Sequence, residues 1–253
     1  MIRLKLTLAY RGTQFFGWQV QPRGRTVQGC LETIVSRMIG QDCRIIGSGR
    51  TDSGVHALGQ VAHVDVPAAK AEIPWQKALN AQLPRDVAVT GVRRVSETFH
   101  ARFSPSIKTY SYTLWQEQGY VLPQRGPYVW PVSPLDLEAM ARAASGLVGE
   151  HDFAAFQNTG SEVTSTIRTL HRIAFMRGQH PGELVLVFSA NGFLKQMVRN
   201  LVGTLVAVGS GSRSQADVPE LLIAADRTAL PATAPAQGLC LERVWYADPQ
   251  WNR

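Results

Sequence analysis

Residues 47–64, GSGRTDSGVHALGQVAHV, place Asp52 inside a glycine-rich turn between two runs that favour β-strands. Glycine-rich turns that follow strands often hold phosphate groups through bare backbone amides. Here Asp52 occupies the place of the third glycine of a GxGxxG loop, and no amphipathic helix follows it. The whole sequence also lacks a Walker-type GK[ST] segment. The turn is therefore predicted to display side chains rather than to bind a nucleotide cofactor.

The segments on either side of this turn predict an α+β protein. Residues 4–10, LKLTLAY, alternate apolar and polar positions, as a half-buried strand does. Thr26 is placed to cap a helix whose apolar face carries Val27, Cys30, Leu31, Ile34, Val35 and Met38. A short helix opened by Pro74 and a strand over residues 86–95 follow.

The second half repeats this order loosely. We expect a strand over residues 107–115, a helix from Ser133 with Asp136 in its first turn, and a hairpin over residues 168–178 and 183–192. A long helix over residues 192–208 should bury Leu194, Met197, Val198, Leu201, Val202 and Leu205, and a last strand lies near residues 238–246.

Because strands and helices do not alternate regularly, the sequence predicts two β-α-β-β-type halves that form a largely antiparallel mixed sheet flanked by helices. Residues 1–105 form the half with the aspartate loop. Residues 106–253 form the half that completes a basic active-site cleft.

The charge balance points to nucleic acid as a partner. There are 26 basic and 19 acidic residues, and 21 of the basic residues are arginine, whose planar fork matches phosphate oxygens. A genome rich in G and C, which favours arginine codons, is the alternative explanation. Candidate phosphate contacts are Arg23, Arg25, Arg93, Arg94, Arg102 and Arg168.

Composition excludes several other classes. The three cysteines are scattered, no CxxC pair occurs, and six histidines complete no zinc pattern, so we expect no metal. His56 and His63 fit structural roles better than a metal pair. The N-terminus has no signal-peptide core and no apolar run is long enough for a bilayer, so a cytoplasmic protein is expected.

Asp52 has two interpretations. Asp before Ser-Gly commonly bonds its own backbone in a turn, which needs no chemistry. Alternatively Arg50 and Asp52 form a pair in a cleft, where the guanidinium favours the ionised carboxylate and the carboxylate attacks a carbon or acts as a base. In the neighbouring loop, Phe15, Phe16 and Trp18 fit the core and an RNA contact equally well.

The segment GSGRTDSGVHALGQVAH resembles the signature of the TruA family of tRNA pseudouridine synthases, GRTDAGVHA-x-GQV. Six further segments resemble later or earlier family blocks in order: YRGTQFFGWQVQP with TVQGCLE, ALNAQLPRDVAV, FHARFSPSIKTYSY, HDFAAFQ, FLKQMVRNLVG and APAQGLCLERVWY. Together they cover essentially the whole chain.

The resemblance implies a homodimeric enzyme that converts uridine to pseudouridine at positions 38, 39 and 40 of the tRNA anticodon stem-loop, without metal or nucleotide cofactor. It makes Asp52 the nucleophile acting on a flipped-out base, with Arg50 beside it and Tyr110 stacked on that base. It places Arg199 and Leu239 at the substrate. Lys195, four residues before Arg199 on the predicted helix, is a weaker candidate for substrate contact.

Two rival functions belong to other classes. A non-catalytic RNA-binding protein would use the same basic surface but would not need Asp52. A zinc-dependent RNA deaminase requires H-x-E and P-C-x-x-C ligands, which the sequence lacks.

Overall fold

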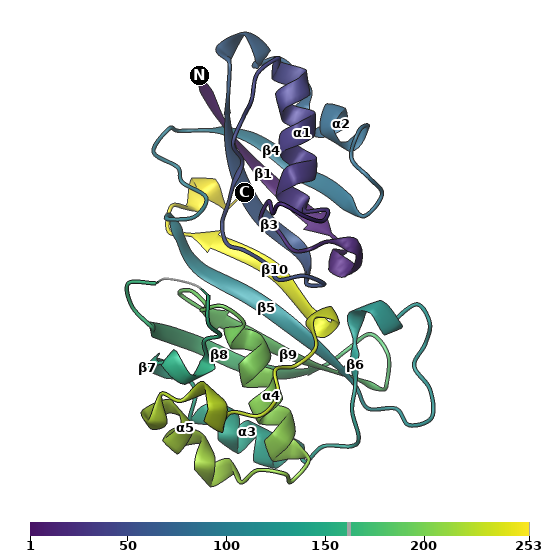
Figure 1. Ribbon diagram of the computed structural model, residues 1–253, viewed down its shortest axis with the longest axis vertical. Helices are drawn as coiled ribbons and strands as arrows, with labels where there is room; N and C mark the ends of the chain where they lie inside the picture. The colour runs from purple at the N-terminus through teal and green to yellow at the C-terminus, as the bar shows by residue number, and fades with distance from the viewer. Residues whose placement is uncertain (161–162, 253) are drawn as a thin grey trace. The chain divides into compact units, whose positions relative to one another are not determined.

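The computed structural model describes residues 1–160 and 163–252, which form two compact units (Figure 1). Unit 1 comprises Met1–Ser106 and Cys240–Arg253, and unit 2 comprises Ile107–Leu239. The sequence assigned residues 240–253 to the second half. They belong with unit 1 because β10 (Leu239–Tyr246) runs parallel to β3, with Cys240 opposite His56 and Leu241 opposite Ala57.

Unit 1 is a mixed sheet in the order β4-β1-β3-β10, in which only the β3–β10 pair is parallel. Its other elements are β1 (Ile2–Tyr10), α1 (Val27–Ile39), β2 (Ile46–Gly47), β3 (His56–Val66), α2 (Trp75–Asn80) and β4 (Val87–Val95). The short strand β2 pairs with β3. The predicted strands and helices of this half are therefore confirmed.

The alternation along β1 separates two environments. Leu4, Leu6 and Leu8 are buried on one face of the sheet. The opposite face carries Arg3, Lys5, Thr7 and Ala9, of which only Lys5 is buried, so the predicted difference between the two faces of β1 is confirmed with Lys5 as the exception. Thr26 caps α1 by accepting a hydrogen bond from the Gly29 amide at 3.2 Å, as the sequence indicated.

His63 of β3 is a structural histidine. It is 3% exposed, and its Nδ1 accepts a hydrogen bond from the Ala101 amide at 3.1 Å. Burial, assisted by Arg3 and His100, lowers the pKa of His63 to about 4, and Asp65 opposes the shift. The ring is therefore neutral at physiological pH.

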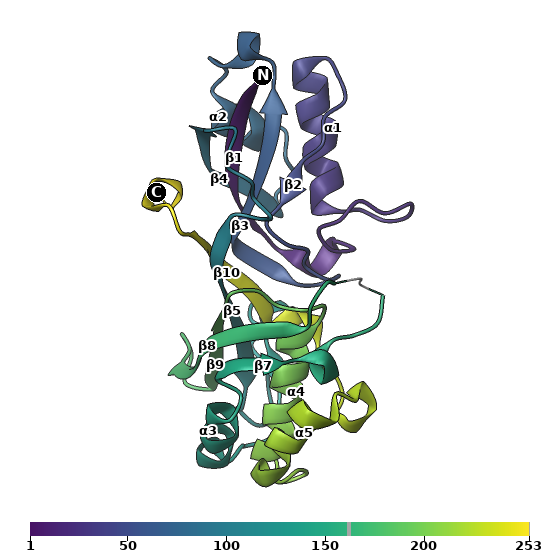
Figure 2. The same ribbon diagram turned by 90° about the vertical axis from the view of Figure 1, so that its left-hand side faces the viewer.

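Unit 2 has a sheet in the order β5-β9-β8-β7, all antiparallel, with β6 parallel to β5. Its strands are β5 (Pro105–Trp115), β6 (Trp130–Pro131), β7 (Gly149–Asp152), β8 (Ile167–Arg177) and β9 (Glu183–Ala190). Its helices are α3 (Leu137–Ser145), α4 (Met197–Gly209) and α5 (Val218–Ala224). Helices α3 and α4 pack side by side (Figure 1 and Figure 2).

Both predicted helices of unit 2 begin later than expected. Asp136 is the N-cap of α3, where its carboxylate accepts from the Ala139 amide, and is not in the first turn. α4 begins at Met197 and not at Gly192, because Gln196 has left-handed backbone angles (φ 60°) that end the helical path. The apolar positions predicted for this segment are nonetheless all buried.

The fold class is confirmed as α+β, with mixed, largely antiparallel sheets and flanking helices in both units. The basic cleft stays a prediction. Within residues 1–160 and 163–252, no helix is both long enough and apolar enough to cross a membrane.

Candidate active site

Asp52 lies in the loop between β2 and β3 of unit 1. The Val55 amide donates to the Asp52 carbonyl at 3.2 Å, and Gly54 follows with a φ of 82°, so the residues after Asp52 form a tight turn. The Asp52 side chain is partly exposed and Arg50 is exposed. The backbone at Asp52 therefore forms a turn, and the role of the Asp52 side chain stays a prediction.

A second loop, residues 11–18, is hydrogen-bonded to the Asp52 turn. The Trp18 amide donates to the Thr51 carbonyl at 3.1 Å, and the Gly54 amide donates to the Phe15 carbonyl at 3.3 Å. Ser53 Oγ donates to the same Phe15 carbonyl at 3.1 Å. The backbone on both sides of Asp52 is therefore fixed by hydrogen bonds from one neighbouring loop.

Two glycines allow the loops to approach this closely. A Cβ on Gly12 would lie 2.0 Å from the Val55 carbonyl oxygen. A Cβ on Gly17, whose φ is 88°, would lie 2.6 Å from the Thr51 carbonyl oxygen. Neither position accepts another residue without displacing the Asp52 turn.

The aromatic residues of the second loop divide between core and surface. Phe15 and Trp18 are each 2% exposed and anchor the loop in unit 1, whereas Phe16 is 56% exposed. The Arg25 guanidinium lies 4.2 Å from the Phe15 ring and forms a bidentate ion pair with Asp86. Arg25 is therefore a structural residue and a poor candidate for a phosphate contact.

The buried side-chain amide of Gln60 is hydrogen-bonded to the segment that leads to Asp52. Gln60, fully buried on β3, accepts from Ser48 Oγ at 2.7 Å and from the Val61 amide at 3.1 Å, and donates to the Gly49 carbonyl at 3.0 Å. Because these bonds satisfy both ends of the amide, Gln60 sets the path of the chain that leads to Asp52.

Tyr10 and Thr51 complete this support, with their hydroxyl oxygens 2.9 Å apart. Burial raises the pKa of the Tyr10 hydroxyl well above its usual range, although hydrogen bonds to Thr51 and Gln60 oppose the shift, so Tyr10 stays neutral. No sequence pattern marked Tyr10, Thr51 or Gln60 as functional. Gln60 was present in the signature segment, but only its burial reveals its role.

His56, the first residue of β3, is also structural. Its Nδ1 accepts from the Gly12 amide at 3.0 Å, and the residue is 5% exposed. No group of three or more His, Cys, Asp or Glu side chains suited to a metal ion occurs among the described residues.

Tyr110 lies on β5 in unit 2 and is 8% exposed. Its ring packs edge-on against Phe193, with centroids 5.2 Å apart. Tyr112, two positions along, is fully buried and donates from its hydroxyl to the Pro235 carbonyl at 2.7 Å. Of the two tyrosines, Tyr112 is therefore committed to the core, and Tyr110 is the better candidate for substrate.

Arg199 is in the first turn of α4 and is partly buried. Its Nε donates to the Ala234 carbonyl at 2.7 Å, and the Ala234 amide donates to the Arg199 carbonyl at 3.2 Å. Burial raises the pKa of Tyr112 well above its usual range, and the nearby Arg199 charge partly offsets this. Arg199 is thus bonded through both its side chain and its backbone to Ala234, five residues before the buried Leu239.

The prediction that Lys195 and Arg199 lie four residues apart on the same helix is wrong. Lys195 lies before α4, is exposed, and donates to the Thr159 carbonyl at 2.6 Å. The left-handed Gln196 separates the two residues and turns the chain between them.

A polar network around Asn200, which sequence analysis also missed, fixes this turn. Asn200 is 1% exposed and donates to the Phe156 carbonyl and to Asn158 Oδ1, at 2.8 and 2.9 Å. Arg227 donates to Asn158 Oδ1 at 2.9 Å, and the Asn158 amide nitrogen donates to Gln196. The segment before Arg199 is therefore held by side-chain amides of unit 2.

Comparison with known proteins identifies the class. The family model described as tRNA pseudouridine synthase matches residues 7–104 and 143–247. This chain belongs to that family, and is accordingly an isomerase of the pseudouridine synthase class.

Relatives of the chain agree over nearly its whole length. It is 57% identical to tRNA pseudouridine synthase A of Solidesulfovibrio magneticus, over 98% of this chain and 93% of the relative. It is 53% identical to the protein of the same name from Maridesulfovibrio salexigens, over 98% and 92% of the two chains. For the Geobacillus kaustophilus protein of that name the identity is 44%, over 97% and 95%.

Proposed function

We propose that this protein isomerises uridine to pseudouridine at positions 38, 39 and 40 of the tRNA anticodon stem-loop, with Asp52 as the nucleophile. Its relatives are named tRNA pseudouridine synthase A, and the sequence carries the signature in which Asp52 is the acidic residue. The observation that carries the proposal is the fixed turn at Asp52, whose backbone neighbours are held by Phe15, Trp18 and Gln60.

The reaction breaks the N1–C1′ bond of uridine, rotates the base, joins C5 to C1′, and releases the proton from C5. A carboxylate serves this chemistry by attacking C1′, by adding to C6 of the ring, or by removing a 2′ proton. Each route requires an ionised carboxylate held at a defined position near the sugar. A turn that is hydrogen-bonded on both sides meets this requirement because no reorganisation is needed on substrate binding.

The target base must leave its stack to reach Asp52, and the other residues have roles in that step. Arg50, exposed two residues before Asp52, occupies the vacated space or holds a phosphate. Tyr110 stacks on the base and presents its hydroxyl near C5, while Arg199 and Leu239 border the base. Lys195 serves only at the periphery of the substrate.

We further propose that the enzyme works as a homodimer in the cytoplasm and needs no metal or nucleotide cofactor. The family resemblance supports the dimer. The scattered cysteines support a cytoplasmic location and the absence of a metal, and the lack of a nucleotide-binding loop supports the absence of a nucleotide cofactor.

The test uses unmodified tRNA transcripts that carry tritium at C5 of uridine. The wild-type protein, without added metal or nucleotide, should release tritium from transcripts with uridine at 38 to 40. Asp52→Asn should lower the rate at least about 1,000-fold while tRNA binding persists. Asp42→Asn, which alters an exposed aspartate elsewhere in unit 1, is the matched control and should keep full activity.

Two results would contradict the proposal. One is a wild-type protein that releases no tritium from any such transcript. The other is an Asp52→Asn variant as active as Asp42→Asn, which would show that Asp52 is not the nucleophile.

A further inference from the structure

Phe16 is an exposed aromatic residue beside the Asp52 turn of unit 1. Both of its neighbours in the chain contact that turn. The Phe15 carbonyl accepts a hydrogen bond from the Gly54 amide at 3.3 Å. A Cβ on Gly17 would lie 3.1 Å from the Asp52 carbonyl carbon. Phe15 and Gly17 are buried, whereas Phe16 is 56% exposed, so the Phe16 ring lies at the surface beside the turn.

Hydrogen bonds and packing fix the position of this ring. The Phe16 amide donates to the Arg25 carbonyl at 2.8 Å, and the Phe16 carbonyl accepts from the Gln21 side chain at 2.6 Å. A Cβ on Gly24, whose φ is 88°, would lie 2.5–3.0 Å from three carbons of the Phe16 ring. One side of the ring therefore lies against the loop backbone. A ring held in this way loses little conformational entropy when it binds a partner.

The charge of the surrounding loop favours a nucleic acid as that partner. Residues 11–25 include three arginines and no acidic residue. Arg25 is paired with Asp86, while Arg11 and Arg23 are exposed. A single exposed phenylalanine is common on protein surfaces and needs no partner. An aromatic ring held in place among arginines is instead typical of surfaces that bind single-stranded nucleic acid.

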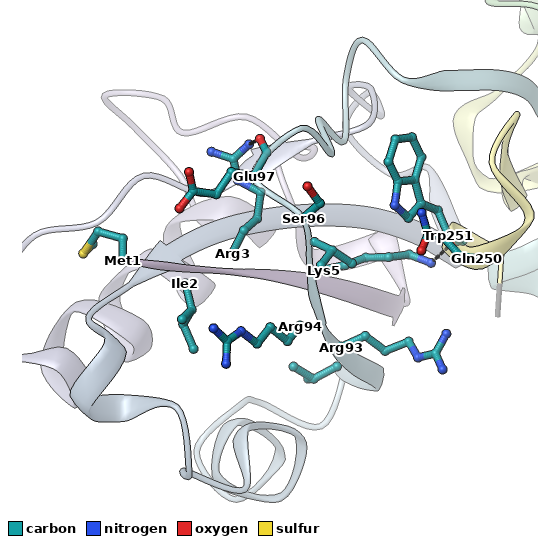
Figure 3. Close-up of a pocket in the computed structure, with 12 residues that line it drawn as sticks. Met1, Ile2, Arg3, Lys5, Arg93, Arg94, Ser96, Glu97, Gln250 and Trp251 are labelled. Carbon is teal, nitrogen blue, oxygen red and sulfur yellow. Dashed lines mark hydrogen bonds between the residues drawn. The ribbon is translucent and has the colours of Figure 1, made fainter.

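A groove of about 840 Å³ elsewhere in unit 1 offers less to a nucleobase. Its lining includes Arg3, Lys5 and Trp251, and Figure 3 shows Lys5 extended toward Trp251. Arg3 forms a bidentate pair with Asp65, and Lys5 donates to the Trp251 carbonyl. The Trp251 ring packs edge-on against Phe99, with centroids 5.3 Å apart. These groups are therefore engaged within the chain.

We propose that Phe16 is a substrate-binding residue whose ring stacks on the nucleobase next to the target uridine. The identification of the ligand as RNA rests on the proposed function. When the target base leaves its stack to reach Asp52, the base beside it loses a stacking neighbour. An aromatic ring fixed beside the Asp52 turn supplies a new stacking partner for that base.

Stacking by Phe16 suits an enzyme that acts at more than one position of its substrate. Every nucleobase has an aromatic face, so a stacked contact tolerates any sequence. A hydrogen bond to the edge of the base would instead select particular bases. Phe16 therefore serves target uridines at 38, 39 and 40 without reading the bases that flank them.

The test measures RNA binding, whereas tritium release tests the proposed function, so the two failures are distinguishable. All proteins carry Asp52→Asn, which keeps the RNA unmodified. The affinity for a fluorescently labelled tRNA transcript with uridine at 39 is measured by anisotropy. The variants are Phe16→Ala, which removes the ring, and Phe16→Tyr, which keeps it. Tyr120→Ala removes a ring of similar exposure (57%) from unit 2 and is the matched control.

Phe16→Ala should weaken binding about 5- to 150-fold, the range that corresponds to the loss of one stacked base. The slope of log affinity against log salt should not change, because no charge is removed. Phe16→Tyr and Tyr120→Ala should bind as the parent protein does.

Two further transcripts locate the stacked base. Each has uridine at 39 and an abasic nucleotide at either 38 or 40. With one of them Phe16→Ala should no longer change the affinity, because the ring then has no base to stack on.

Four results would overturn the inference. The first is equal affinity of Phe16→Ala and Tyr120→Ala. The second is a Phe16→Tyr variant as weak as Phe16→Ala, or a smaller salt slope in Phe16→Ala, which would indicate a displaced loop. The third is an effect of Phe16→Ala that is the same with both abasic transcripts as with the intact one. The fourth is an unchanged affinity with a shifted monomer–dimer equilibrium, which would place Phe16 in a protein interface.

Discussion

Replacing Gln60 by methionine tests whether the buried amide positions Asp52. Methionine has the same length and no branch, so it keeps the packing but removes the hydrogen bonds to Ser48, Gly49 and the Val61 amide. Each buried polar group left unsatisfied costs about 1–3 kcal/mol, and the groups are linked, so we expect a total loss of about 2–4 kcal/mol.

This loss should appear both in stability and in rate. The Tm should fall by roughly 5–15 °C, from about 2–4 °C per kcal/mol for a chain of this size. Because the backbone before Asp52 is then free to shift, the single-turnover rate of tritium release at saturating tRNA should fall about 100-fold, as for a displacement near 1 Å. The rate is measured well below the Tm of the variant.

Gln28→Met is the matched control for this experiment. Gln28 is 2% exposed and also bonds backbone groups at both ends of its amide, the Val20 amide and the Ile45 carbonyl. It does not bond residues 48–55. We expect a similar fall in Tm with little change in rate. Equal rates for Gln60→Met and Gln28→Met would refute the positioning role of Gln60.

The remaining predictions concern Gly17 and His63. Gly17→Ala should cost about 1–3 kcal/mol and lower tritium release at least about tenfold, because its Cβ would meet the Thr51 carbonyl at 2.6 Å. Gly40→Ala, which also has positive φ (78°) but open space around it, should lose about 1 kcal/mol and no rate, and equal rates for both would count against the close-approach argument. The pKa of His63 is lowered to about 4 in the folded state, so protonation favours unfolding and stability falls as pH drops from about 6.5 toward 4. The free energy of unfolding in urea should be roughly 2 kcal/mol lower at about pH 5 than at about pH 7. His63→Gln should remove most of this difference. If the pH dependence is unchanged in His63→Gln, groups other than His63 cause it.

Local patterns were sufficient for most of the fold. Strict alternation predicted β1, and Thr26 with the following apolar stripe predicted α1, because strand and helix periods are imposed by backbone geometry alone. The hairpin of β8 and β9 followed from two β-rich runs around a turn. The family signature likewise placed Asp52, since a motif is a property of the sequence.

Local patterns failed where one residue departed from the periodic conformation. The apolar periodicity of residues 192–208 continues through Gln196, but the backbone there is left-handed, so α4 begins at Met197 and Lys195 lies off the helix. The amides of Asn158 and Asn200 hold this break, and they meet only after the chain has folded.

The sequence by itself determined the fold class, most of the elements, the family and the aspartate on which the proposed chemistry rests, because periodicity, capping and motifs are local. Only the tertiary structure decided which residues support the Asp52 turn and which face of the sheet buries a lysine. Gln60 and Tyr10 are 50 residues apart in the sequence, and Lys5 and Arg93 are also far apart. Strand register decides which of these distant residues become neighbours. Register depends on how the whole sheet packs, which no local pattern contains.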